Sequence, residues 1–437
     1  MQLIKKYVAK QQIIILLKKT LLLILCFTTL MAYSQDTIVN YKKRVLESVE
    51  IDLLASYYSQ DGDNAAVTGG IGTEELTDLA SSIVVSIPLN DDAILKIDAN
   101  VSAYTSASSS NVDAFDTEGQ VADPFVASSG ASGSDEWVNG VIAYSHSSDD
   151  RNNIWGANVS VSKEYDYFSI GFGGSYTHLF NEKNTEVSIS GNVYFDQWKL
   201  IYPGEIRESF NEDVPEELAR KGLPTDKRNS YALGFGFSQI LSKRAQGSLS
   251  LDLVQQEGLL STPFQRIYFS DVVNPIIIGN FRFADDIERL PSSRFKIAIG
   301  GRLNYFLNEV FVLRSYLRYY QDNWGITSYT AGLEVPIKLG DFFTLYPSFR
   351  YYTQSKANYF YRANDALSTD AFYTSDYDLS SFNAGEFGFG VSYTDIFTKV
   401  KLLGYGLKSI NAKGTYYNRS SSLSYFMVSV GIKLVQD

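Results

Sequence analysis

The sequence predicts an all-β protein, a transmembrane antiparallel up-and-down β-barrel of about sixteen strands preceded by a signal peptide. Segments of about ten residues alternate between apolar and polar side chains, which is the period of a strand whose two faces meet different solvents. Short turns and long polar loops separate these segments in alternation, as in barrels of the outer membrane. Tyrosine (31), phenylalanine (27) and glycine (32) are abundant and proline (10) is scarce, which fits aromatic-rich strands with few interruptions.

The clearest of these segments lies between Glu309 and Asp322. An apolar face opposite an arginine-bearing face predicts a strand with hydrocarbon on one side and water on the other. A length of about ten residues is enough for a tilted strand to cross a bilayer. The apolar face is Phe311, Leu313, Leu317 and Tyr319, and the other face is Val312, Arg314, Tyr316, Arg318 and Tyr320.

Residues 1–34 are typical of a secretory signal peptide. Five lysines precede or flank an apolar core at 20–30, and Ala32-Tyr33-Ser34 offers small residues for cleavage. The alternative, a transmembrane anchor, is disfavoured because the apolar run is shorter than the ~18 residues that an anchor needs. We therefore expect a short periplasmic segment at 35–47, followed by an outer-membrane barrel at 48–437 with long extracellular loops.

Removal of this leader also removes Cys26, the single cysteine, so that disulfides and cysteine chemistry are excluded from the mature chain. The formal net charge changes from -11 to -16, and so acidic a chain is a poor candidate for binding nucleic acid. After the leader there is no run of ~18 apolar residues, which excludes a helical membrane protein. The absence of linkers and low-complexity spacers favours one large domain.

The predicted strands alternate with tight turns and long loops along the whole chain. An even number of strands returns both ends of the chain to the periplasmic side. The long loops are expected at 59–77, 105–135, 197–228, 256–293 and 355–379, with a short helix at 215–222. The strands are expected at 49–58, 81–89, 94–104, 137–146, 155–162, 168–179, 187–195, 231–240, 248–254, 295–305, 309–322, 326–337, 343–352, 382–393, 407–417 and 423–435.

Charged side chains fall on the strand faces that should line the lumen. One interpretation is a charged pore or a polar seat for a plug or partner. The other is a self-paired interior that only stabilises the wall, since the architecture requires a polar inner face in any case. The predicted lumen-lining residues are Glu50, Asp52, Lys96, Asp98, Arg314, Arg318 and Arg350.

Tyrosine pairs occur at the ends of four strands that should run outward. One member of each pair would face lipid and form an aromatic belt at the outer interface. The alternative is that tyrosine is simply common in strands. The predicted belt consists of Tyr57, Tyr319, Tyr351 and Tyr416, each followed by a second tyrosine.

Catalytic and metal-binding constellations are sparse in this sequence. His146 and His178 are the only histidines, and a Ser-His-acid hydrolase would need one of them beside a serine at a common depth. The segment from Asp61 to Glu75 carries oxygen donors that could bind calcium. Ala65 and Ala66, however, occupy positions where a calcium loop needs a donor and a glycine, so a structural acidic loop is favoured. No cofactor motif and no His/Cys metal centre is predicted.

Several short motifs resemble an uncharacterised Gram-negative envelope family, domain-of-unknown-function family 3570. The resemblance implies an outer-membrane barrel with no agreed activity. It further implies neighbours such as small lipoproteins, thioredoxin-like proteins and flavin-attaching proteins, and hence a link to envelope redox chemistry. The similar pieces include Ser56-Tyr57-Tyr58, Ala66-Val67-Thr68-Gly69-Gly70, Leu260-Ser261-Thr262-Pro263-Phe264, Glu288-Arg289-Leu290-Pro291, Arg318-Tyr319-Tyr320, Arg350-Tyr351-Tyr352 and Thr374-Ser375-Asp376-Tyr377-Asp378-Leu379-Ser380.

From residues and resemblance together we predict a non-enzymatic barrel in the outer membrane of a Gram-negative bacterium. It would be a channel, or a scaffold that docks an accessory lipoprotein or an envelope redox partner, with outer-membrane lipids as its surroundings. The alternative is an outer-membrane lipid or ester hydrolase of the barrel phospholipase type.

Overall fold

The computed structural model describes residues 43–104, 135–203, 206, 224–273, 275–278, 281–402 and 404–436. Four sequence predictions lie wholly or partly outside these residues: the signal peptide at 1–34, residues 35–42 of the periplasmic segment at 35–47, most of the loop at 105–135, and the helix at 215–222. The barrel belongs to the compact unit Arg44–Asp437.

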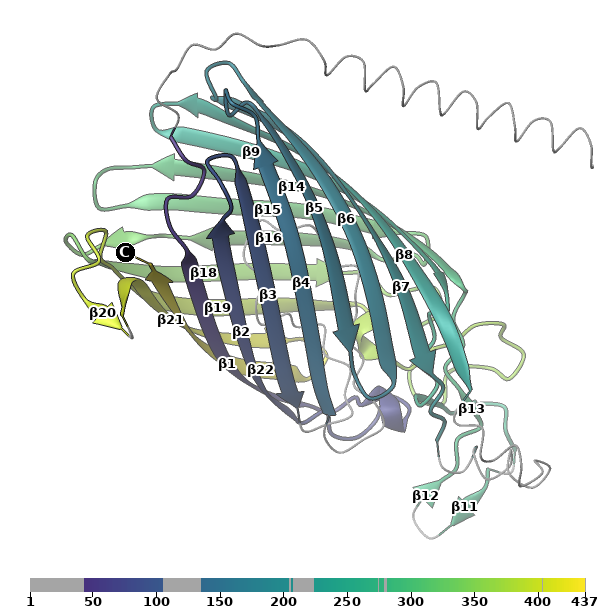
Figure 1. Cartoon of the computed structure of the whole chain (residues 1–437). Helices are drawn as coiled ribbons and strands as arrows, with labels where there is room; N and C mark the ends of the chain where they lie inside the picture. The colour runs from purple at the N-terminus through teal and green to yellow at the C-terminus, as the bar shows by residue number, and fades with distance from the viewer. Residues whose placement is uncertain are drawn as a thin grey trace, which may run out of the picture. The chain divides into compact units, whose positions relative to one another are not determined.

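Sixteen long strands make up the wall in the described part of the chain (Figure 1). The predicted number and order of strands are confirmed. The strands are β1 (Glu50–Gly62), β2 (Leu76–Pro88), β3 (Ala93–Tyr104), β4 (Asp135–Ser147), β5 (Asn153–Lys163), β6 (Tyr167–Phe180), β7 (Thr185–Lys199), β8 (Thr225–Ser242), β9 (Ala245–Gly258), β14 (Ser293–Phe306), β15 (Val312–Asp322), β16 (Thr327–Glu334), β18 (Phe343–Gln354), β19 (Phe382–Thr394), β21 (Tyr405–Arg419) and β22 (Leu423–Val435).

Each long strand pairs antiparallel with its neighbour in the chain, and the last strand returns to the first. In that closing pair Glu50 of β1 lies opposite Val435 of β22, and Gly62 lies opposite Leu423. A closed sheet has no free edge along its length, which is the condition for a sheet in hydrocarbon. The fold is therefore the all-β, up-and-down barrel that the alternation predicts.

Short elements decorate this wall. β17 (Ile337–Lys338) and β20 (Lys401–Leu402) extend the main sheet. The other short elements lie in the loops: η1 (Ala66–Thr68), β10 (Arg266–Ile267), β11 (Ile277–Ile278), β12 (Phe281–Arg282), β13 (Asp286–Ile287) and η2 (Tyr377–Leu379). Within the described ranges, no helix has the length and hydropathy needed to cross a membrane.

The two faces of the wall differ in their surroundings. On β1, Tyr57 is 47% exposed whereas the next residue, Tyr58, is 3% exposed. On the face of Tyr58, side chains of strands that are not neighbours meet: Tyr425 of β22 donates a hydrogen bond to Glu386 of β19 at 2.7 Å, across β21. Side chains converge only inside a closed sheet, so this face is the interior and the face of Tyr57 is the exterior.

The exterior carries large apolar side chains in open exposure. Leu317 is 65% exposed, and Phe387 and Leu79 are each 63% exposed. A continuous apolar exterior of this kind would be an aggregation hazard in water and is the expected surface in lipid.

Tight turns connect the strands at one end of the barrel, which we call the short-turn end. The long loops lie at the other end, which we call the long-loop end (Figure 1). Asparagine and aspartate side chains bind the turn backbone at the short-turn end. Asn90 Oδ1 accepts from the amides of Asp92 and Ala93 at 2.8 and 2.9 Å. Asn308 Oδ1 accepts from two amides of its turn, both at 2.9 Å. Such Asx turns fix the tight connections and hence the register of the strands.

Two details of the predicted strands are wrong. The strand predicted at 326–337 is interrupted, because Pro336 has no amide hydrogen for the ladder and separates β16 from β17. At the long-loop end the strands extend further than predicted, so that β2 begins at Leu76 and β8 at Thr225. Leu76 packs in a buried cluster with side chains of β1 and β22, and residues 225–227 are exposed, so neither extension shows the alternation that lipid and water impose.

Candidate functional site

Three loops pack together at the long-loop end, and we call them the loop cover: residues 63–75, the described part of 259–292, and 355–381. Gly69 has a φ of 82° and lies against the ring of Tyr268, where a Cβ atom would be 2.4 Å from the ring. Arg266 donates to the carbonyl of Val67 at 2.6 Å, and Ser375 donates to the carbonyl of Arg266 at 3.0 Å. Gly70 lies against Ser375, where a Cβ atom would be 3.0 Å from the carbonyl oxygen, so each loop contacts both of the others.

The loop cover is also anchored to the inner face of the wall. The Gln354 amide on β18 donates to the carbonyls of Asp378 and Ser380 at 2.8 and 2.6 Å. Arg419 at the end of β21 forms an ion pair with Asp378 at 2.5 Å. Apolar packing adds to these contacts, because Tyr320 on the inner face of β15 packs against the buried cluster that includes Phe360. The loop 355–381 thus folds back over the interior.

Buried carboxyl groups lie at the centre of this packing. Glu288 accepts hydrogen bonds from the Thr262 amide and the Thr374 hydroxyl, and burial raises the pKa of Glu288 to about 7 against these opposing hydrogen bonds. Burial, followed by the charges of Asp378 and Glu288, raises the pKa of Asp376 well above its ordinary value. Protons are therefore bound more tightly when the loop cover is packed than when it is released.

This linkage predicts that the loop cover loosens as pH rises. Below its ordinary pKa of 4.5, a carboxyl whose pKa is raised by packing is protonated in both states and does not change the stability of the packed loops. As the pH rises from there to the raised pKa of about 7, the packed state becomes progressively less stable relative to the released state. Hydrogen–deuterium exchange of the peptides around Glu288 and Thr374, corrected for intrinsic rates, should accelerate between about pH 5 and pH 8. Glu288→Gln should reduce this dependence and leave the part that Asp376 contributes, and an unchanged pH profile in that variant would contradict the assignment.

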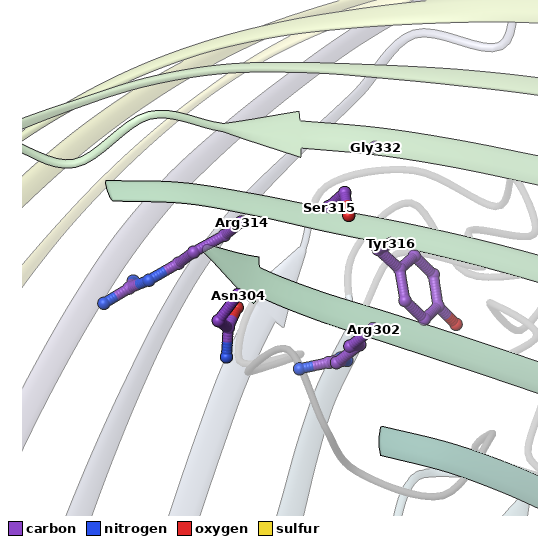
Figure 2. A pocket seen from close by; sticks show the side chains of 6 residues that line it. All are labelled: Arg302, Asn304, Arg314, Ser315, Tyr316 and Gly332. Carbon is purple, nitrogen blue, oxygen red and sulfur yellow. The ribbon is translucent and has the colours of Figure 1, made fainter. Parts of the chain in front are cut away.

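A cavity of about 250 Å³ lies on the wall formed by β14, β15 and β16 (Figure 2). Arg302, Asn304 and Arg314 project from the two adjacent strands β14 and β15 to the same side of the sheet, as Figure 2 shows. The register places Arg302 opposite Tyr316 and Asn304 opposite Arg314. The lining residues are Arg302, Asn304, Arg314, Ser315, Tyr316 and Gly332.

The two arginines of the cavity have different partners. Arg314 donates through Nη1 to Glu334 of β16 at 2.8 Å, and its guanidinium lies 5.9 Å from the ring centre of Tyr346. The guanidinium of Arg302 lies 5.0 Å from the ring centre of Tyr316. In the described residues no carboxylate pairs with Arg302. The ring instead positions this guanidinium by a cation–π contact.

The other residues predicted to line the lumen fall into separate groups. Glu50 binds Lys408 at 2.7 Å and Lys433 at 2.8 Å, and Asp52 binds Lys433 at 3.3 Å. Lys96 and Asp98 are 4.0 Å apart on β3.

Two more predicted lumen residues lie elsewhere on the wall. Arg318 is 4.0 Å from Asp252, and Arg350 lies opposite Glu386 in the ladder of β18 and β19. The seven predicted residues therefore do not form one site, and of them only Arg314 lines the cavity. Arg302 and Asn304 were missed, although the same alternation on the predicted strand 295–305 places both on its polar side.

The predicted belt tyrosines lie on the exterior. Tyr57, Tyr351 and Tyr416 are half-exposed, and Tyr319 packs against Tyr329 of β16 with ring centres 5.3 Å apart. A membrane-interface role for these four residues stays a prediction.

The histidines do not form a hydrolase site. Register places His146 opposite Trp155, and the two rings are 6.0 Å apart. His178 Nδ1 lies 2.8 Å from Asn153 Oδ1. In the part of the chain that the structure describes, neither histidine has a serine hydrogen-bond partner. The hydrolase alternative is therefore not supported.

The acidic segment from Asp61 to Glu75 has its donors spread out. Glu74 is buried and accepts from the amide of Asn64 at 3.1 Å, whereas Asp61 and Asp63 are exposed. Among the described residues no three His, Cys, Asp or Glu side chains gather as a metal site would require.

The comparisons with known proteins concern the family and the shape of the barrel. A family model described as "Protein of unknown function (DUF3570)" matches residues 29–422. No curated protein matches the sequence. Among solved structures, the chain is similar to a bacterial polysaccharide outer membrane secretin, with 10% identity and a TM-score of 0.45 over 89% of this chain and 99% of that one.

Two further solved structures are similar at the same low level of identity. A mutant of the TodX monoaromatic hydrocarbon channel has 9% identity and a TM-score of 0.40, over 90% of this chain and 91% of that one. The siderophore receptor PirA from Acinetobacter baumannii has 11% identity and a TM-score of 0.42, over 86% of this chain and 53% of that one. The chain thus spans about half the length of the siderophore receptor.

Proposed function

The chain belongs to the family of proteins of unknown function DUF3570, and for this member we propose the function of a solute channel in the outer membrane of a Gram-negative bacterium. The long-loop end faces the outside of the cell and the short-turn end faces the periplasm, which is the usual orientation of such barrels. The protein acts by passage or binding of solutes and carries out no chemistry.

The closure of sixteen strands around a polar interior carries this proposal. Barrels of eight strands are filled by their own side chains, whereas barrels of about sixteen enclose a water-filled path. An apolar exterior with Leu317 and Phe387 in open exposure favours a lipid surrounding.

The loop cover restricts this path at its outer end. The ion pair of Arg419 with Asp378 and the hydrogen bonds of Gln354 hold loop 355–381 against the inner wall. The cavity beside Arg302 lies on β14 and β15, nearer to the short-turn end than the loop cover. A solute that enters from outside would pass the loop cover first and then reach the arginines.

Docking of a small envelope lipoprotein or a redox protein remains a second proposal, which the family resemblance motivates. The hairpin of β11 and β12 offers a surface for it, because Val273, Ile276 and Ile277 are exposed there at 89%, 62% and 58%. Apolar side chains that are this open to water are common in protein interfaces.

The channel proposal predicts ionic conductance. Purified protein, fused into a planar bilayer from proteoliposomes, should produce discrete conductance steps in potassium chloride. Asp378→Ala should raise the conductance of each step, because loop 355–381 loses its ion pair with Arg419. Bilayers that contain the protein but conduct no ions, both for the wild type and for Asp378→Ala, would contradict a channel.

A further inference from the structure

We propose that the cavity beside Arg302 is an oxyanion-binding site that receives the phosphate or carboxylate group of a solute crossing the barrel. This inference names a substrate class and therefore rests on the proposed channel function. The binding groups are Arg302 and Arg314, with Asn304 and Tyr316 as neutral partners (Figure 2).

Arg302 supplies the charge that is not neutralised by the protein. Its guanidinium has no carboxylate partner among the described residues, and it is held 5.0 Å from the ring centre of Tyr316. A guanidinium presents up to five N–H donors in a planar fork, which matches the two oxygens of a carboxylate or phosphate. A positioned, unpaired arginine in a cavity is therefore preorganised for such a group.

Arg314 adds a second guanidinium on the adjacent strand. It binds Glu334 through Nη1 alone, which leaves its remaining N–H groups for a ligand. Asn304 lies opposite Arg314 in the ladder, and its side-chain amide adds two further donors. Two guanidinium groups beside one carboxylate leave the cavity with a net positive charge.

Several other basic side chains of the inner wall, unlike Arg302, have a carboxylate partner. Arg228 binds Asp196 at 2.8 Å and Arg294 binds Asp322 at 2.6 Å. Lys408 and Lys433 bind Glu50 and Asp52. In a chain with a net charge of -11, an uncompensated guanidinium inside the wall provides local attraction for anions.

The cavity also has room for a ligand group. Gly332 contributes no side chain, and a Cβ atom there would have its nearest neighbour, Tyr316 Cβ, at 3.8 Å. A volume of about 250 Å³ exceeds the space of a phosphate or a small dicarboxylate and their water.

Ion selectivity and block test the site. In a planar bilayer under a potassium chloride gradient, the wild type should have a reversal potential whose sign indicates selectivity for anions. Sodium phosphate or sodium succinate should reduce its chloride conductance. Arg302→Gln should shift the reversal potential towards cation selectivity and weaken the block at least about tenfold, since a charge-assisted hydrogen-bond pair is lost.

Arg302→Lys keeps the charge without the planar fork, so the reversal potential should recover more than the block. Lys183→Gln, the loss of one positive charge in an exposed turn outside the cavity, is the matched control and should change neither.

The outcomes separate the site from the channel. Block by phosphate alone or succinate alone identifies which oxyanion the site accepts. An active channel in which Arg302→Gln alters neither selectivity nor block overturns the site and leaves the channel intact. If the wild type conducts no ions, equilibrium dialysis of the solubilised protein against radiolabelled phosphate and succinate tests whether the site binds an oxyanion. Binding of either anion that Arg302→Gln removes supports the site without a channel, and binding of neither overturns both.

Discussion

Replacing Asp322 by alanine is expected to destabilise the barrel by about 3 to 5 kcal/mol, the loss typical of breaking a buried ion pair. Oδ2 of Asp322 accepts from Arg294 at 2.6 and 3.0 Å and from the Tyr320 hydroxyl at 2.9 Å. Oδ1 accepts from the amides of Trp324 and Ile326 at 3.0 and 2.9 Å. The Asp322 side chain has no exposure, so each of these donors would lose its partner out of reach of bulk water.

The surroundings of Asp322 amplify this loss. The Arg294 guanidinium lies 4.3 Å from the ring centre of Trp324, and an uncompensated guanidinium in this place is costly. Urea unfolding of the protein in lipid vesicles, followed by tryptophan fluorescence, measures the change. Asp341→Ala, which removes an exposed carboxylate from a turn, is the control and should change the free energy of unfolding by less than about 0.5 kcal/mol. Similar losses at the two positions would contradict the central role of Asp322.

The second large effect is expected at the exterior of β15. Leu317→Arg should destabilise the barrel by about 2 to 4 kcal/mol in vesicles, because a guanidinium at the midplane of the bilayer loses its hydration. Leu317 is 65% exposed and lies in the middle of β15, so the substitution removes little internal packing. The unfolding experiment described for Asp322 applies here.

Two controls isolate the charge from the change of shape. Leu317→Met keeps an apolar side chain of similar volume and should be nearly neutral. Asn100→Arg adds the same guanidinium to β3 on the interior, next to the exterior residue Val101, and should cost less than Leu317→Arg because water reaches the lumen. Equal costs at Leu317 and Asn100 would exclude different solvents on the two faces.

The strands were predictable from the sequence because lipid and water act on each residue locally. In β15 successive side chains face lipid and water in turn, so apolar and polar residues alternate with a period of two. The ends of the strands were harder, because residues such as Tyr58 and Leu76 at the long-loop end pack against one another in a buried cluster. No solvent contrast marks such positions. The interruption at Pro336 was readable, since a proline is poorly tolerated inside a strand.

The candidate site was only partly predictable. Arg314 was identified from its own strand, and the same alternation would have identified Arg302. Their proximity depends on the register of β14 with β15, which no local pattern records. The pairing of Glu50 with Lys408 joins residues 358 positions apart and follows only from closure of the barrel.

In a membrane barrel the two faces of β15 must meet different solvents, and cysteine labelling measures this directly. The chain's single cysteine, Cys26, falls in the predicted leader, so an introduced cysteine would be the only thiol of the mature protein that can react. In native membranes, Arg314→Cys should react with a charged methanethiosulfonate from the aqueous phase, whereas Leu317→Cys should react only with a lipid-soluble maleimide. The reverse pattern, with the charged reagent reaching residue 317 and not residue 314, would contradict a barrel with lipid outside and water inside.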